Sequence, residues 1–209
     1  MKLSEKFYVK MFNDLAQFDN ITKDKWYKSM YRYMIDSKYR IMMDLQQFSQ
    51  REIYQPGDKL FEVAKRLYNK NPDATVINAL RYVVDNVKYL SDFKNYGKTE
   101  YWASAGETLE RGYDDCDGMN NLVRTLCVYA GVPDFLIYNV IGYCMDPNNN
   151  MVGHYWLVYY SINHEKFVAI DSTYYPKFDS IKVRPPFKLT SDKYERIWYL
   201  WNEHMTLKQ

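Results

Sequence analysis

One cysteine in this sequence stands where its thiol could do chemistry. Cys116 begins an expected helix, where free backbone N–H groups and the positive end of the helix dipole favour a thiolate. A thiolate is the nucleophile that covalent acyl transfer requires. The neighbouring Asp114, Asp115 and Asp117 act against it, because nearby negative charge raises the pKa of a thiol. An imidazolium partner would therefore be needed to hold the ion pair.

One of the three histidines is expected in a fixed position. His154 falls inside an expected strand over 152–160, whereas His164 lies in an expected turn and His204 near the C-terminus. Asp171 ends the next expected strand, which would run antiparallel beside the first. We therefore expect His154 and Asp171 side by side. An aspartate in that place fixes the tautomer of the imidazole and stabilises its protonated form.

The motifs around these residues resemble the transglutaminase-like superfamily, and especially its bacterial cysteine proteinases. Asp171 follows His154 by 17 positions and His154 follows Cys116 by 38, a spacing that fits the family. The resemblance covers about half of the chain, from near Ala74 to Pro176. The matching residues, with x for any residue, are Trp102-x-x-x-x-Glu107-Thr108-Leu109-x-x-Gly112-x-x-Asp115-Cys116-Asp117-Gly118, then Leu122, Leu126, Gly131-Val132-Pro133, Gly153-His154-Tyr155-Trp156 and Ile170-Asp171-Ser172-Thr173.

This resemblance implies a catalytic triad and a fold. Cys116 would attack a carbonyl, His154 would act as base and acid, and Asp171 would orient His154. The backbone N–H of Cys116 would form part of an oxyanion hole, with Trp102 or Asn86 as candidates for the second donor. Trp102 could equally be a packing anchor. The implied fold is α+β and papain-like, with the nucleophile at a helix N-terminus packed on an antiparallel sheet.

The implied activity is acyl transfer on peptide or amide bonds through a thioester, with a protein or peptide as substrate. Hydrolysis is favoured, and cross-linking by transfer to an amine is an alternative that the triad does not separate. The acids around Cys116 and the high aromatic content leave a further alternative open. The chain could keep the fold with a weakly activated thiol and serve as a binding protein or scaffold.

The sequence departs from the family pattern beside the nucleophile. Asp114 stands where the family often has glycine, and Met119-Asn120 replaces an aromatic–Ala pair. No cofactor is expected, although some of the bacterial proteinases bind calcium through acids flanking the nucleophile. Asp115 and Asp117 could form part of such a site, but Gly118 lacks a further acid, and a solvated acidic cluster is favoured.

A zinc site built from Cys116, Cys127, His154 and His164 is less favoured still. Cys127 falls on the apolar face of its helix and is expected in the core. The three cysteines form no C-x-x-C pair, which disfavours both a standard zinc site and a disulfide framework.

Hydrophobic periodicity outlines the elements that must position these residues. Three units are expected: a helical N-terminal extension over 1–57 ending at Pro56-Gly57, the core over 58–176, and a C-terminal extension over 177–209 that packs on the core. Helices are expected over much of the first fifty residues, after Asp58, after Pro72, after Cys116 and over 191–205. Strands are expected over 135–144, 152–160 and 166–170. The stretch 91–113 is irregular and polar.

Composition and charge narrow the function classes. Hydrophobic residues make up 47% and charged residues 26%, as in an ordinary globular protein. A formal net charge of +2 argues against a nucleic-acid partner bound by bulk electrostatics. Residues 58–176 alone carry a net charge of −4, which would favour cationic substrates. No apolar stretch approaches the roughly 18–20 residues of a membrane span, and no signal peptide begins the chain, so a cytoplasmic protein without membrane contact is expected.

Aromatic residues reach 18%, with 22 tyrosines, which either reflects a base-composition bias or marks a binding surface. The N-terminal extension mixes them with basic side chains, a combination that can bind single-stranded nucleic acid. A helical hairpin that packs its aromatic rings on the core is favoured. The residues concerned are Trp26, Tyr27, Tyr31, Tyr33 and Tyr39 with Lys25, Lys28, Arg32, Lys38 and Arg40.

Overall fold

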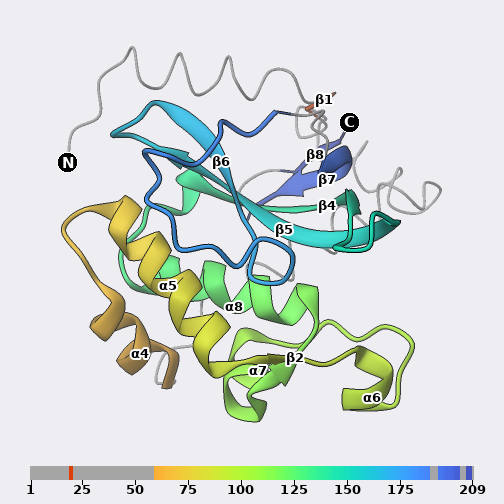
Figure 1. Cartoon of the computed structure of the whole chain (residues 1–209). Helices are drawn as coiled ribbons and strands as arrows, with labels where there is room; N and C mark the ends of the chain where they lie inside the picture. The colour runs from red at the N-terminus through yellow and green to blue at the C-terminus, as the bar shows by residue number, and fades with distance from the viewer. Residues whose placement is uncertain (1–18, 21–58, 189–192, 203–205, 209) are drawn as a thin grey trace, which may run out of the picture.

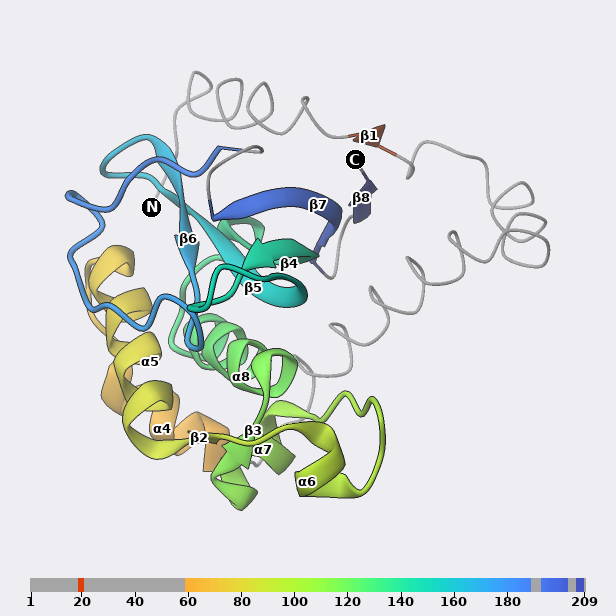
Figure 2. The same cartoon turned by 45° about the vertical axis from the view of Figure 1, so that its right-hand side comes forward.

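The computed structural model describes residues 19–20, 59–188, 193–202 and 206–208 (Figure 1). The helices expected before Pro56, with their aromatic and basic side chains, lie outside these residues, as does His204. In the described part, helices cover one face of a sheet in which every paired strand is antiparallel (Figures 1 and 2). The α+β class expected from the sequence is confirmed.

Three helices begin where the sequence predicts, and a side-chain cap accounts for the start of two of them. Pro72 is pre-organised for a first helical turn, and the Asn71 side chain caps that helix by accepting from the Asp73 N–H at 3.0 Å. The Asp115 side chain caps the next helix by accepting from the Asp117 N–H at 3.3 Å. The three helices are α4 (Lys59–Leu67), α5 (Pro72–Asn86) and α8 (Cys116–Tyr129).

The polar stretch 91–113 contains two further helices, α6 (Asp92–Tyr96) and α7 (Ala105–Arg111). Both end at glycines in the left-handed region, Gly97 at φ 68° and Gly112 at φ 70°. Helices of five and seven residues are too short to display an apolar period, which is why the sequence pattern looks irregular. Two short parallel strands, β2 (Lys88–Tyr89) and β3 (Tyr113–Asp114), lie with α7 on the far side of α8 from the main sheet (Figure 2).

The predicted meander is confirmed as β4 (Ile137–Met145), β5 (Met151–Ser161) and β6 (Lys166–Ile170). β4 begins later than expected because Asp134–Leu136 forms a short 3-10 helix. The full sheet has the order β1-β8-β7-β4-β5-β6, in which β1 (Asp19–Asn20) pairs with β8 (Thr206–Lys208).

The helix expected over 191–205 is wrong in the described part of that segment. Tyr194–Trp201 is strand β7, which pairs with β4 inside the sheet. Ile197, Tyr199 and Trp201 alternate and are buried, and aromatic residues suit a strand that gains hydrogen bonds from a neighbour. A β-bulge at Ile141/Gly142 accommodates the pairing, and a Cβ at Gly142 would lie 2.0 Å from the Arg196 carbonyl oxygen.

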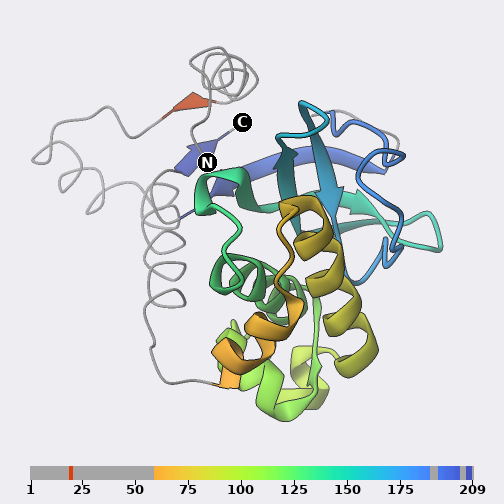
Figure 3. The same ribbon diagram turned by 90° about the vertical axis from the view of Figure 1, so that its left-hand side faces the viewer.

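Helix α8 packs between the sheet and the outer helices, as the three views agree (Figures 1 to 3). Its Leu122, Val123, Leu126 and Cys127 are completely buried in the main hydrophobic core. Burial of this apolar stripe fixes the first turn of α8, which carries Cys116, against the strand that carries His154. No helix in the described segments is long and apolar enough to cross a membrane.

Candidate active site

Cys116 is the first residue of α8 and lies directly after the capping Asp115. Burial raises the pKa of its thiol well above the ordinary value, and the carboxylates of Asp115 and Asp117 raise it further. The backbone N–H of Tyr155, the residue after His154, donates to the sulfur and acts in the opposite direction. The resting thiol is therefore protonated, and activation requires a base beside it.

His154 and Asp171 lie side by side, with 3.0 Å between the Nε2 and Oδ2 atoms of two buried side chains. The other ring nitrogen, Nδ1, is buried and has no hydrogen-bond partner among the described residues. The ring of Tyr174 stacks on the imidazole with centroids 4.4 Å apart. Because Asp171 accepts from Nε2, Nδ1 is the nitrogen left to act as a base.

Asp171 is held by donors from three segments. Its Oδ1 accepts from the Thr173 N–H at 3.0 Å, the Thr173 hydroxyl at 2.9 Å and the Tyr174 N–H at 3.1 Å. Its Oδ2 also accepts from the Tyr194 hydroxyl at 2.9 Å. Burial alone would raise the pKa of Asp171, but His154 and the backbone donors hold it well below its usual range. Sequence reasoning missed Tyr194 because it expected a helix there.

Asn120 joins the three segments that carry these residues. This completely buried side chain donates through Nδ2 to the Cys116 carbonyl at 3.0 Å and the Tyr155 carbonyl at 2.8 Å. Its Oδ1 accepts from the N–H and hydroxyl of Ser172 at 2.9 and 3.0 Å. One amide thus fixes the backbone next to Cys116, His154 and Asp171 at once. The sequence marks Asn120 only as a departure from the family pattern.

Cys116 and His154 line one cavity of about 370 Å³ that opens between α8 and the sheet. Its wall combines aromatic rings with carboxylates. The lining residues are Tyr89, Glu100, Trp102, Asp115, Cys116, Asp117, Ile141, Gly153, His154, Tyr155, Tyr174 and Trp198.

Of the two candidates for the second oxyanion donor, only one lines the cavity of Cys116. Trp102 lines the cavity, and its indole N–H donates to Glu100 Oε1 at 2.8 Å. Asn86 does not line it: the side chain is exposed at the end of α5 and donates to the Tyr82 carbonyl at 2.8 Å. Trp102 therefore lies in the cavity with Cys116 and His154, whereas Asn86 lies outside that cavity.

Carboxylates beside Cys116 form a site suited to a hard cation. Oxygens of Asp92, Glu100 and Asp117 lie within 4.8 Å of one another, and Asp92 forms a second such group with Asp114 and Asp115. Asp92 Oδ1 and Asp117 Oδ1 are buried without a hydrogen-bond partner in the described part of the chain. Burial, and then the charge of Asp115, raise the pKa of Asp117 to about 9. The sequence pointed to Asp115 and Asp117 but missed Asp92 and Glu100.

The departure from the family pattern at Asp114 depends on Gly118, a residue that matches the pattern. The Asp114 carboxylate accepts from the Thr108 hydroxyl at 2.6 Å, the Tyr96 hydroxyl at 3.0 Å and the Asp115 N–H at 3.0 Å. It occupies the space that a side chain at position 118 would need, since a Cβ on Gly118 would lie 2.2 Å from Asp114 Cγ. The acid at 114 therefore requires a glycine at 118.

Replacing a glycine inside a helix by alanine usually stabilises the helix, and at Gly118 we expect the opposite. Gly118→Ala is expected to destabilise the fold by roughly 2 kcal/mol, because the overpacking against Asp114 outweighs the gain in helix propensity. Chemical denaturation measures the loss. Adding Asp114→Gly should make the double variant more stable than the sum of the two single effects. A stabilised Gly118→Ala protein would contradict the packing described here.

The residues of the less favoured zinc site lie apart. Cys127 is fully buried in the core of α8. His164 faces Asp73, with 3.7 Å between His164 Nε2 and Asp73 Oδ2. Neither residue lines the cavity of Cys116 and His154, so these four side chains do not form one site.

Comparisons with known proteins support the fold. No protein-family model matches the sequence, and no curated protein sequence matches it. Among solved structures, LapG of Legionella pneumophila, a transglutaminase-like cysteine protease, aligns with a TM-score of 0.52 at 18% identity, covering 80% of this chain and 87% of that chain. EGTA-treated LapG gives 0.52 at 18%, covering 80% and 84%, and calcium-bound LapG gives 0.49 at 20%, covering 80% and 87%. The chain has the transglutaminase-like fold that its motifs resemble.

Proposed function

We propose that this chain is a cysteine-dependent hydrolase that cleaves peptide or amide bonds in a protein or peptide substrate through a thioester on Cys116. The proposal rests on one observation above the others. His154 has Nε2 fixed by Asp171 and Nδ1 buried without a hydrogen-bond partner among the described residues, in the cavity that Cys116 also lines. In that arrangement the imidazole of His154 can accept the proton of the Cys116 thiol and so activate the nucleophile.

In this mechanism, His154 Nδ1 takes the thiol proton as the Cys116 sulfur attacks the substrate carbonyl. The free backbone N–H at the start of α8 donates to the developing oxyanion. The protonated imidazole, stabilised by Asp171, then gives its proton to the leaving amine. Water, activated by the same imidazole, hydrolyses the thioester and restores the thiol.

Hydrolysis rather than transfer to an amine fits the surroundings of the thiol. Gly153 and Glu100, at the wall of the cavity, are both exposed. Water can therefore reach a thioester on Cys116.

We also propose a calcium site formed by Asp92, Glu100 and Asp117. All three offer carboxylate oxygens, the ligands that Ca²⁺ prefers, and two of these oxygens are buried without another partner in the described residues. Bound Ca²⁺ would supply positive charge next to Cys116 and offset the effect of the carboxylates on its thiol. No other cofactor is proposed.

Calcium is therefore expected to raise the melting temperature by about 5 °C or more when it is well above its dissociation constant. EGTA should reverse the shift. Asp92→Asn should abolish most of it, because the amide removes one charged ligand, whereas Asp85→Asn, at an exposed position of α5, should keep it. An equal shift in both variants, measured by scanning calorimetry, would rule out this ligand set.

The scaffold reading is the second candidate, and the raised pKa of Cys116 favours it. The two readings differ in the reactivity of the thiol. At pH 7, alkylation of Cys116 by iodoacetamide should slow by roughly tenfold or more in His154→Ala, because the base is lost. His164→Ala is the matched control and should be silent, since that imidazole faces Asp73 and does not line the cavity of Cys116. Peptide mass spectrometry resolves the rate at Cys116, and equal rates in all three proteins would favour a scaffold.

A further inference from the structure

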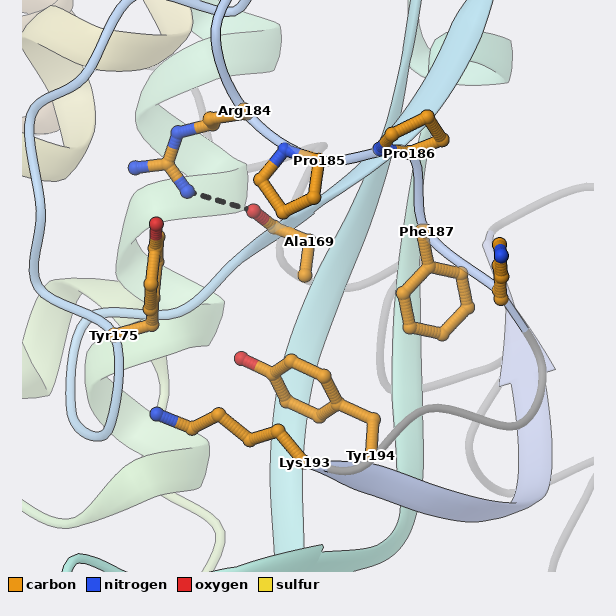
Figure 4. A pocket seen from close by; sticks show the side chains of 9 residues that line it. Ala169, Tyr175, Arg184, Pro185, Pro186, Phe187, Lys193 and Tyr194 are labelled. Atoms are coloured by element: carbon orange, nitrogen blue, oxygen red, sulfur yellow. Dashed lines mark hydrogen bonds between the residues drawn. The ribbon is translucent and has the colours of Figure 1, made fainter.

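A second cavity, of about 310 Å³, lies between the segment that follows β6 and the start of β7 (Figure 4). It shares no lining residue with the cavity of Cys116. Most of its wall is apolar or aromatic, and its basic lining residues are Arg184 and Lys193, with the exposed Lys188 next to Phe187. The lining residues are Ala169, Tyr175, Arg184, Pro185, Pro186, Phe187, Lys188, Lys193 and Tyr194.

Arg184 is a buried cation without an ion-pair partner among the described residues. Its guanidinium donates only to main-chain carbonyls: to Ala169 at 2.8 Å, to Asp179 at 3.4 Å, and to Lys177. The carboxylates of Asp179 and Asp171 act on it only at longer range. Buried arginines are usually paired with an acid, because an uncompensated charge in the interior is costly.

Two lysines bring further positive charge to the same place. The Arg184 Cζ lies 5.1 Å from the centroid of the Tyr175 ring, the Lys177 Nζ 5.2 Å and the Lys193 Nζ 5.4 Å. Lys193 also donates to the Tyr174 carbonyl. None of the three forms an ion pair with a carboxylate in the part of the chain that is described. Three like charges around one ring repel one another, and a bound anion would relieve that repulsion.

The side of the cavity away from Arg184 is mostly apolar and held in place. Phe187 lies on that side, and the ring of Tyr194 lies between it and Lys193, with the Phe187 and Tyr194 ring centroids 6.0 Å apart (Figure 4). The Phe187 N–H donates to the Phe167 carbonyl at 2.7 Å, which ties the segment to β6. A ligand that fits both sides has an anionic group and an apolar body.

We infer that this cavity binds a carboxylate that carries an apolar or aromatic group. The carboxylate would lie near Arg184 and Lys193, since a guanidinium fork matches carboxylate geometry, and the apolar body would contact Phe187 and Tyr194. A doubly charged phosphate fits less well against these largely apolar walls. The same chemistry occurs in a free aromatic acid and in the C-terminal residue of a peptide.

The cavity touches the proposed active site through one side chain. Tyr194 lines the cavity and donates its hydroxyl to Asp171 Oδ2. A bound carboxylate would therefore contact a residue that holds the His154–Asp171 pair. The binding site itself does not depend on the proposed catalytic activity, because it uses neither Cys116 nor His154.

Isothermal titration calorimetry on the full chain tests this site with two matched pairs of probes. The first pair is 3-phenylpropanoate and its neutral amide, and the second is acetyl-Gly-Gly-Phe with a free or an amidated C-terminus. Each acid should bind at least about tenfold more tightly than its amide, because a charge-assisted hydrogen bond is lost in the amide. Binding of the peptide acid identifies a peptide C-terminus as a source, and binding of the free acid alone identifies a small molecule.

Variants locate the binding. Lys193→Met keeps the aliphatic stem but should weaken binding of the acid by roughly fivefold or more, and Ala169→Leu should block it by filling the cavity. Lys182→Met removes an exposed charge from the segment that follows β6 and should leave binding of the acid unchanged. Cys116→Ala should bind normally, which separates this test from that of the hydrolase. Failure of both acids to bind, equal binding of acid and amide, or equal effects of Lys193→Met and Lys182→Met would overturn the inference.

Discussion

Replacing Cys116 with alanine is expected to abolish acyl transfer and to leave the melting temperature within about 2 °C of the wild-type value. Turnover should fall by at least roughly 10⁴-fold, because Cys116 is the one thiol among the described residues that line the cavity. Stability should hardly change, since only a small, half-buried side chain is lost. The release of p-nitrophenol from p-nitrophenyl esters and thermal denaturation by circular dichroism measure the two effects.

Cys127→Ala is the matched control, because it makes the same chemical change in the core of α8. That thiol is completely buried, so its loss should destabilise the fold by about 1–2 kcal/mol and leave turnover intact. The two cysteines of one helix should thus show opposite patterns. A Cys116→Ala protein that melts far lower, or that keeps its turnover, would show that this thiol is structural.

Asn120→Ala is expected to reduce both stability and turnover. It leaves the carbonyls of Cys116 and Tyr155, and the N–H and hydroxyl of Ser172, without their buried partner. Each unsatisfied buried group costs about 1–3 kcal/mol, so a total of roughly 3–5 kcal/mol is expected once the local structure relaxes. Turnover measured well below the melting temperature should fall mainly in kcat, because the reacting groups lose their relative positions.

Asn121→Ala is a close control on the same helix. Asn121 is also buried, yet neither polar atom of its side chain has a hydrogen-bond partner within the described residues. Its removal should therefore cost little and leave kcat unchanged. If the two asparagine variants behaved alike in kcat, Asn120 would have no positioning role.

The sequence could predict those parts of the site that depend on local signals. An apolar stripe located the helix that begins at Cys116, and β-branched and aromatic residues located the strand of His154. Asp171 follows directly from the neighbouring strand, because consecutive strands with short connections usually pair. The pairing of these two strands was enough to predict that His154 and Asp171 lie side by side.

Residues that depend on distant partners could not be predicted. Tyr194–Trp201 is dominated by large aromatic and aliphatic residues, whose periodicity does not separate a strand from a helix in eight residues. β4 decides the outcome by pairing with it, and Tyr194 then reaches Asp171. Asp92 and Glu100 come from a polar stretch without periodicity, so only the fold brings them to Asp117. The role of Asn120 likewise exists only once three segments meet.

The thioester on Cys116 is the central claim, and intact-protein mass spectrometry tests it most directly. The protein is mixed with an excess of p-nitrophenyl acetate, quenched in acid within seconds and weighed. Wild-type protein is expected to gain one acetyl group, located at Cys116 by peptide mapping, whereas Cys116→Ala should gain none and His154→Ala should gain it far more slowly. No adduct on the wild-type protein, or an equal adduct on Cys116→Ala, would contradict the account.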